Sequence, residues 1–220
     1  GTNIISGAGS FTLTNAATAT LGLGDAGGIA TSGATGNIRT TTRTYGIGAN
    51  IIYNGTTAQV TGTGLATVWG ATNTTVTINN AAGVSLSQNL AFTAGTNGSL
   101  ILQDGQFIIG SNTLTIPTLG TVSTPSSFSS SRMIVADGTG QVVKTIPTGA
   151  SAFLYPIGDN SASANGSEYS PVNLNFSANA TSGNIGVKVT NTAHPSNGTA
   201  ANYFNRYWTF TTATVTTYTY

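Results

Sequence analysis

Short apolar–x–apolar triplets recur along the first half of the chain, and each triplet predicts a short β-strand. In a strand alternate side chains share one face, so the first and third residues of a triplet point the same way. Gly, Asn, Ser or Asp separates most of the triplets, and these residues suit turns. The clearest triplets begin at Val76, Val84, Leu90, Leu100, Phe107 and Leu114.

The triplets repeat with a nearly constant period. Val76 lies 24 residues before Leu100, and Val84 lies 23 residues before Phe107. One and two periods earlier, the predicted strands fall at Ile52, Val60 and Val68, and at Ile29, Ile38 and Tyr45. Three short strands per period predict that residues 1–120 form a short three-sided parallel β-solenoid (β-helix) of four to five coils. The alternative is a β-sandwich, although its strands usually recur every 8–12 residues.

A different pattern follows a Ser/Thr-rich connector at residues 121–131. Residues 132–136 and 141–144 flank an Asp137-Gly138 turn, which predicts a β-hairpin. Longer alternating segments follow at 151–157, 169–178, 184–191 and 203–212. Alternating apolar and polar residues indicate a strand with one buried and one solvent-exposed face. We therefore predict that residues 132–220 form a small antiparallel β-sandwich. We expect it to pack on the last coil and cover its open edge.

Composition narrows the class of protein. Of 220 residues, six are Lys or Arg and five are Asp or Glu, which gives a net charge of +1 and 5% charged residues. A typical soluble domain has about 25%. The net charge near zero argues against nucleic-acid binding. No apolar run is long enough for a transmembrane helix. Cysteine is absent, so no disulfide, thiol nucleophile or zinc–thiolate site is expected.

A series of sequence blocks gives the chain a family resemblance. In the first half they are Gly7–Leu13, Thr31–Ile38, Tyr53–Leu65, Val76–Ser87 and Gly110–Ile116. In the second half they contain Tyr155, Pro156, Gly158, Asp159, Tyr169, Pro171, Arg206, Tyr207 and Trp208. In this order the blocks resemble modules of large secreted surface proteins of the Bacteroidetes type, which are adhesin-like, repetitive and exported by type IX secretion. The resemblance implies an extracellular or cell-surface location and a structural or adhesive role.

The C-terminal tail, Thr211–Tyr220, has high β-propensity and contains no charge, Pro or Gly. One interpretation is a final strand of the sandwich, and the other is a strand donated to a neighbouring subunit. Trp69 breaks the solenoid pattern, and we expect it to lie outside a coil as a contact residue. The candidate assembly residues are therefore Thr211, Val215, Tyr218, Tyr220 and Trp69. We expect the partners to be further copies of the chain or neighbouring modules of a larger one.

Catalytic residue types are scarce, so we expect a non-enzymatic protein without a cofactor. His194 is the single histidine, and no G-x-S-x-G motif occurs. Asp159 and Glu168 flank one polar loop and are weak calcium candidates, but the EF-hand spacing fails because position 12 is Ser170.

Aromatic residues near the C-terminal end suggest an alternative function. We expect Arg206 to bind loop carbonyls or Asp159, with Trp208 in the core. Alternatively, Tyr155, Tyr207 and Trp208 form a platform for surface glycans. The chain would then be a carbohydrate-binding module of a larger secreted protein.

Overall fold

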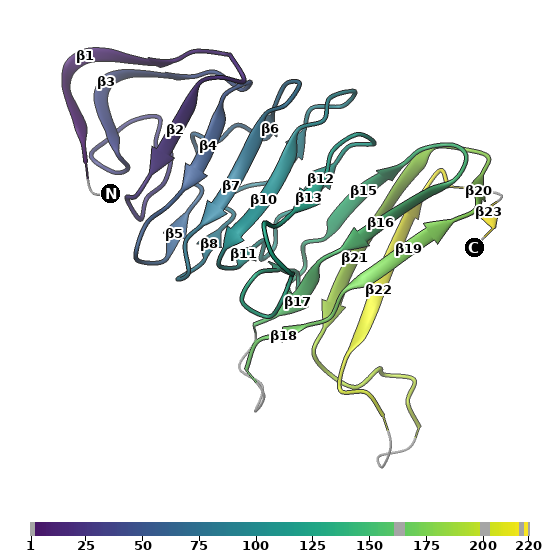
Figure 1. Cartoon of the computed structure of the whole chain (residues 1–220). Helices are drawn as coiled ribbons and strands as arrows, with labels where there is room; N and C mark the ends of the chain where they lie inside the picture. Colours follow the sequence, from purple (N-terminus) through teal and green to yellow (C-terminus); the bar gives the residue numbers. More distant parts are fainter. Residues whose placement is uncertain (1–2, 161–165, 199–202, 216–217, 220) are drawn as a thin grey trace.

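The computed structural model describes residues 3–160, 166–198, 203–215 and 218–219, and in these ranges it contains β-strands and no α-helix. This confirms the predicted all-β class. The part of the chain that the structure describes accordingly holds no apolar helix of membrane-spanning length. The strands form three larger sheets, one parallel and two mixed, and three two-stranded sheets (Figure 1).

The first large sheet is parallel throughout. Its strand order is β13-β10-β7-β4-β2, so consecutive neighbours are far apart in sequence. The strands are β2 (Thr20–Leu23), β4 (Asn50–Tyr53), β7 (Thr75–Asn79), β10 (Ser99–Asp104) and β13 (Val122–Ser123).

The second and third large sheets are parallel at first and end in antiparallel strands. The second contains β5 (Gln59–Val60), β8 (Val84–Ser85), β11 (Phe107–Ile108), β14 (Ile134–Val135), β17 (Ile157–Asp159) and the antiparallel β18 (Glu168–Tyr169). The third contains β6 (Val68–Trp69), β9 (Leu90–Phe92), β12 (Leu114–Ile116), β15 (Val142–Ile146) and the antiparallel β21 (Gly183–Thr190) and β22 (Tyr207–Ala213).

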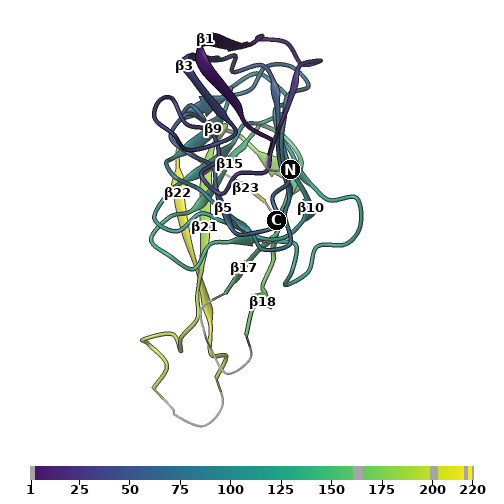
Figure 2. The ribbon, with the colours of Figure 1, turned by 90° about the vertical axis from the view of Figure 1, so that its left-hand side faces the viewer.

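The two-stranded sheets lie toward the ends of the molecule. At the N-terminal end, β1 (Ile5–Leu13) pairs in parallel with β3 (Ile38–Tyr45). At the other end, β16 (Ser151–Tyr155) pairs with β19 (Val172–Phe176), and β20 (Ala178–Asn179) pairs with β23 (Tyr218–Thr219), both antiparallel. Figure 2 faces the N-terminal side of the molecule and shows β1 and β3 side by side at the top of the view.

The chain visits the three large sheets in rotation, one strand in each. The sets β4–β6, β7–β9, β10–β12 and β13–β15 are four such three-strand units. The predicted partners Val76 and Leu100 are paired, as are Val84 and Phe107. Their side chains are buried because each unit covers the inward residues of the next.

One unit earlier, the predicted positions are wrong by one residue. Ile51 rather than Ile52 pairs with Val76, and Gln59 rather than Val60 pairs with Val84. Trp69 is fully buried and donates its indole N–H to the Ala49 carbonyl over 3.1 Å. The prediction of an exposed Trp69 is therefore wrong, because this ring fills the interior where Val68 was expected.

The earliest predicted unit is also wrong. The partner of β4 is β2, with Leu21 opposite Ile51, and Ile29 is buried outside any strand. Ile38 and Tyr45 instead belong to β3, whose eight residues pair with β1. The long Thr-rich segment of β3 suits one extended strand better than two short ones separated by a turn.

The predicted hairpin at residues 132–144 does not form. β14 pairs in parallel with β11 and β17, whereas β15 pairs with β12 and β21. The connection between them packs closely on the preceding unit, since a Cβ on Gly140 would lie 2.0 Å from the Asn112 carbonyl oxygen. Parallel ladders therefore run past residue 131, and β18 and β21 then end two of them in antiparallel pairing.

Candidate functional site

Among the described residues, the outer edge of β22 is the longest unpaired strand edge at the C-terminal end. β22 pairs with β21 without a bulge, from Tyr207 opposite Thr190 to Ala213 opposite Asn184. It is the last strand of its sheet, so its other edge has no neighbouring strand among the described residues. Its β-branched and aromatic residues favour this extended form, and none of them is charged.

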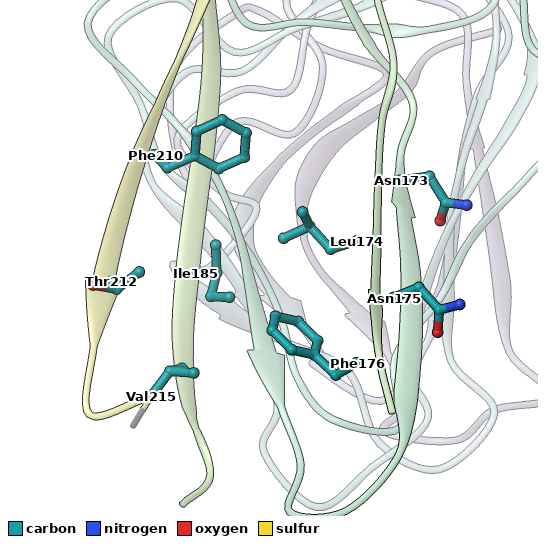
Figure 3. Close-up of a pocket in the computed structure, with 8 residues that line it drawn as sticks. All are labelled: Asn173, Leu174, Asn175, Phe176, Ile185, Phe210, Thr212 and Val215. Carbon is teal, nitrogen blue, oxygen red and sulfur yellow. The ribbon is translucent and has the colours of Figure 1, made fainter. Parts of the chain in front are cut away.

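An open apolar groove of about 500 Å³ lies between β19 and the strands β21 and β22. Figure 3 shows Leu174 and Phe176 facing Ile185, Phe210 and Val215 across it. Asn173, Asn175 and Thr212 complete the lining, so none of the lining side chains is charged. Phe210 remains 48% exposed, and no strand of the described residues lies on the outer side of β22.

A charged cluster anchors the beginning of β22. The Arg206 guanidinium binds the Glu168 carboxylate and the Ser170 hydroxyl, and it lies 3.8 Å from the Asp159 carboxylate. Trp208 donates its indole N–H to the Ser170 carbonyl over 3.0 Å. The strand is therefore tied to β17 and β18 at one end.

Burial raises the pKa of Asp159, whose carboxyl group is fully buried. The Arg206 guanidinium acts in the opposite direction, whereas the nearby Glu168 and Asp137 carboxylates raise this pKa further. The Asn191 amide donates to Asp159 Oδ1 over 3.2 Å, but Oδ2 accepts no hydrogen bond. The cluster thus holds a buried carboxylate at an energetic cost that the ion pair with Arg206 offsets only in part.

The structure brings together several of the predicted signature residues. Asp159 opposes Glu168, and Gly158 opposes Tyr169, across β17 and β18, with Arg206 against the two carboxylates. The Arg206–Asp159 contact expected from the sequence is present, while the Glu168 contact was not anticipated. Trp208 was expected in the core, yet it is 37% exposed.

The other signature residues surround this cluster or support it. Tyr155 is buried, and its hydroxyl donates to the Ile185 carbonyl over 2.9 Å. Pro156 is buried beside it, and Pro171 is exposed before β19. A side chain at Gly158 would collide with the Glu168 carbonyl oxygen and the Met133 sulfur.

The predicted calcium ligands face a guanidinium. Within the described ranges, no group of three or more His, Cys, Asp or Glu side chains is placed to hold a metal ion. Calcium at Asp159 and Glu168 would have to displace Arg206, which contacts both. Calcium binding remains a prediction.

The tail residues pair within their own chain. Thr211 is exposed on β22, and Val215 lines the groove. Tyr218 belongs to β23, which pairs with β20. Tyr220 lies outside the described residues.

The predicted sugar platform does not form as a set of three rings, because Tyr155 is buried. The ring of Tyr207 is half-buried and lies edge-on to His194, with centroids 4.9 Å apart. Phe210 is the residue that sequence reasoning missed. Its signal is the alternation Trp208, Phe210, Thr212 in a strand without charge.

Lys144 is a second feature that sequence reasoning missed. Its ammonium is buried and donates to the carbonyl oxygens of Pro117, Thr118 and Gly120 over 2.6–2.9 Å. The ring of Phe153 lies 4.9 Å from the same nitrogen. Burial lowers the pKa of Lys144 to about 8. This cation holds the 117–120 turn through its three hydrogen bonds.

No protein-family model, curated protein or solved structure matches the chain.

Proposed function

We propose that the chain is a non-enzymatic structural module of an extracellular or cell-surface protein, either an adhesin stalk or a subunit of a surface filament. The rotation of the strands among three sheets supports a short three-sided β-solenoid as its body. The pair β16–β19 and the strands β15, β21 and β22 are then the two layers of a small sandwich that ends the solenoid. The resemblance to secreted Bacteroidetes-type surface modules supports the location.

The observation that carries this proposal is the uncharged, unpaired edge of β22 beside an uncharged apolar groove. Proteins usually protect such an edge with charge, proline, bulges or short length. An unprotected edge favours strand addition, and a net charge of +1 leaves little long-range repulsion between copies. Packing and strand addition therefore supply the mechanism, and no chemical step is required.

Electron microscopy of the native material from the cell surface tests the proposal. Regular fibres with an axial repeat near one subunit length are expected for a filament subunit. Long irregular stalks would support the adhesin form. Dispersed compact particles at all concentrations would contradict both.

A carbohydrate-binding module is the second candidate, favoured by exposed rings near one end of β22. Phe204 is 84% and Tyr203 50% exposed, and Trp208 follows them on the same stretch. Aromatic faces commonly stack on sugars in such modules. Binding on a glycan array that is lost in Trp208→Ala but retained in Leu154→Ala would support this function, and no binding to any glycan would count against it.

A further inference from the structure

We propose that β22 is the joint between two copies of this chain, which pair antiparallel through their β22 edges about a two-fold axis at Phe210. The proposal rests on the structural function proposed above and deepens it by naming the partner and the register. Such a pairing would join the third large sheet of one copy to that of the other and cover the outer edge of β22.

Among the edge strands in the described part of the chain, β22 is the longest that carries neither a charge nor a register shift. β5, β6, β13, β18, β20 and β23 have two residues each, so they offer little backbone to a partner. β2, β16 and β19 are also uncharged and regular, but they have only four or five residues. β1 has an irregular register between Gly7 and Ser10, and β3 carries Arg39 and Arg43. β22 has seven residues, an unbroken register and no charge. Because bulges, charges and short strands are the usual protections, β22 is the least protected of these edges.

The sequence of β22 is compatible with pairing to itself. Phe210 is the central residue of Tyr207–Ala213, so a two-fold axis there places Phe210 opposite Phe210 of the second copy. Trp208 then opposes Thr212, and Thr209 opposes Thr211. Opposed side chains in an antiparallel pair lie on the same face of the sheet. The aromatic rings of both copies would therefore meet on the groove side, where Phe210 is now half-exposed.

The area available predicts a weak dimer. A large aromatic side chain presents about 200 Å². With Phe210 48% and Trp208 37% exposed, the four rings of two copies would bury about 350 Å². The rings alone supply less than a third of about 1,200 Å², the lower limit of standard specific interfaces, so the strand edges must supply much of the contact. Association is therefore expected at high micromolar concentration, or wherever copies are concentrated on a surface.

A cysteine cross-linking experiment tests the register, because the chain has no cysteine of its own. Phe210→Cys places two thiols directly opposite each other in the proposed pair. On oxidation, full 220-residue Phe210→Cys chains should form disulfide-linked dimers at least tenfold faster than Leu154→Cys chains. Leu154 is an exposed residue on β16 and serves as the control. Thr212→Cys alone should link at the control rate, because two such thiols would lie four residues apart.

A second pair of variants keeps the Phe210 ring. An equimolar mixture of Trp208→Cys and Thr212→Cys should form mixed dimers faster than either protein alone. Equal rates for the mixture, the single variants and Leu154→Cys would overturn the proposed register.

Sedimentation of the wild type should show a dimer that Phe210→Lys removes and Leu154→Lys retains. A monomer at millimolar concentration would overturn the joint.

The two proposals fail in different ways. Fibres in native material without accelerated linking at Phe210→Cys would overturn this joint and leave the proposed function standing. Rapid linking at Phe210→Cys, together with native material that contains only isolated dimers, would support the joint and contradict the filament.

Discussion

Single buried polar groups hold the connections between strands. The Lys144 ammonium donates hydrogen bonds to three carbonyl oxygens of the 117–120 turn. Without a side-chain partner at this position, the connection would leave polar backbone atoms unsatisfied. Gln59 acts similarly in an earlier unit. Its amide donates to the carbonyls of Leu23 and Asp25 and accepts from Asn80. Both residues point inward from strands, so polar side chains at such positions bind turns rather than solvent.

Lys144 should make stability depend on pH in the alkaline range. The folded-state pKa is about 8, against 10.5 for the unfolded chain. Between these values the unfolded chain binds more protons, so the free energy of unfolding contributed by this group rises with pH. The rise is at most about 1.4 kcal/mol per pH unit. Below pH 8 the cost of burying the cation is fully present.

Urea unfolding from pH 7.5 to 9.5 would measure this effect in the wild type and in Lys144→Met. The free energy of unfolding of the wild type, relative to that of Lys144→Met, should rise with pH. Because both proteins contain the same tyrosines, this comparison cancels the tyrosine contribution. A difference that is constant with pH would show that Lys144 has an ordinary pKa in the folded state.

At the scale of the element, one large side chain shows why Trp69 rather than Val68 is the inward-facing residue of β6. Val68 and Trp69 are adjacent, and either could face inward. Trp69 does so, fully buried, and leaves Val68 49% exposed. A ring of this size buries more apolar area than a valine, and its N–H finds the Ala49 carbonyl. A count of apolar periods cannot make this choice, because it treats both residues alike.

Truncation of these neighbours should have very different effects. Trp69→Ala should lower the free energy of unfolding by about 3–5 kcal/mol, because it leaves a large cavity in the core. Val68→Ala, the adjacent control, should change it by less than about 1 kcal/mol. Chemical denaturation followed by circular dichroism measures both. Similar losses for the two variants would contradict the inward position of Trp69.

Across the whole molecule, the sequence predicted the repeating part better than the end. The pairing of Val76 with Leu100 follows from a period that is visible in apolar spacing. The period lengthens beyond residue 120, where Leu114 pairs with Val142, and the local Asp137-Gly138 signal then suggested a hairpin that the parallel ladders exclude. Turn chemistry is local, whereas the choice of strand partner depends on the sheets already formed.

The groove and the charged cluster were harder to predict for a related reason. Phe210 and Leu174 lie on strands separated by most of the C-terminal segment, and their meeting depends on how β19 lies over β21 and β22. Arg206 and Asp159 were connected in advance only because few charges exist to pair. The contact between Arg206 and Asp159 was predictable from the sequence, whereas the position of Phe210 in the groove was not.

The parallel ladders also make the length of the molecule adjustable. Each unit from β7 to β12 adds one strand to every large sheet, while β18 and β21 turn the direction of pairing only at the far end. A duplicated segment of one period, inserted between two such units, would lengthen the body by one strand spacing, about 4.8 Å. Both ends would keep their contacts. A lineage of such chains can therefore vary the length of the body by copying one short stretch of gene, while the contacts at both ends stay the same.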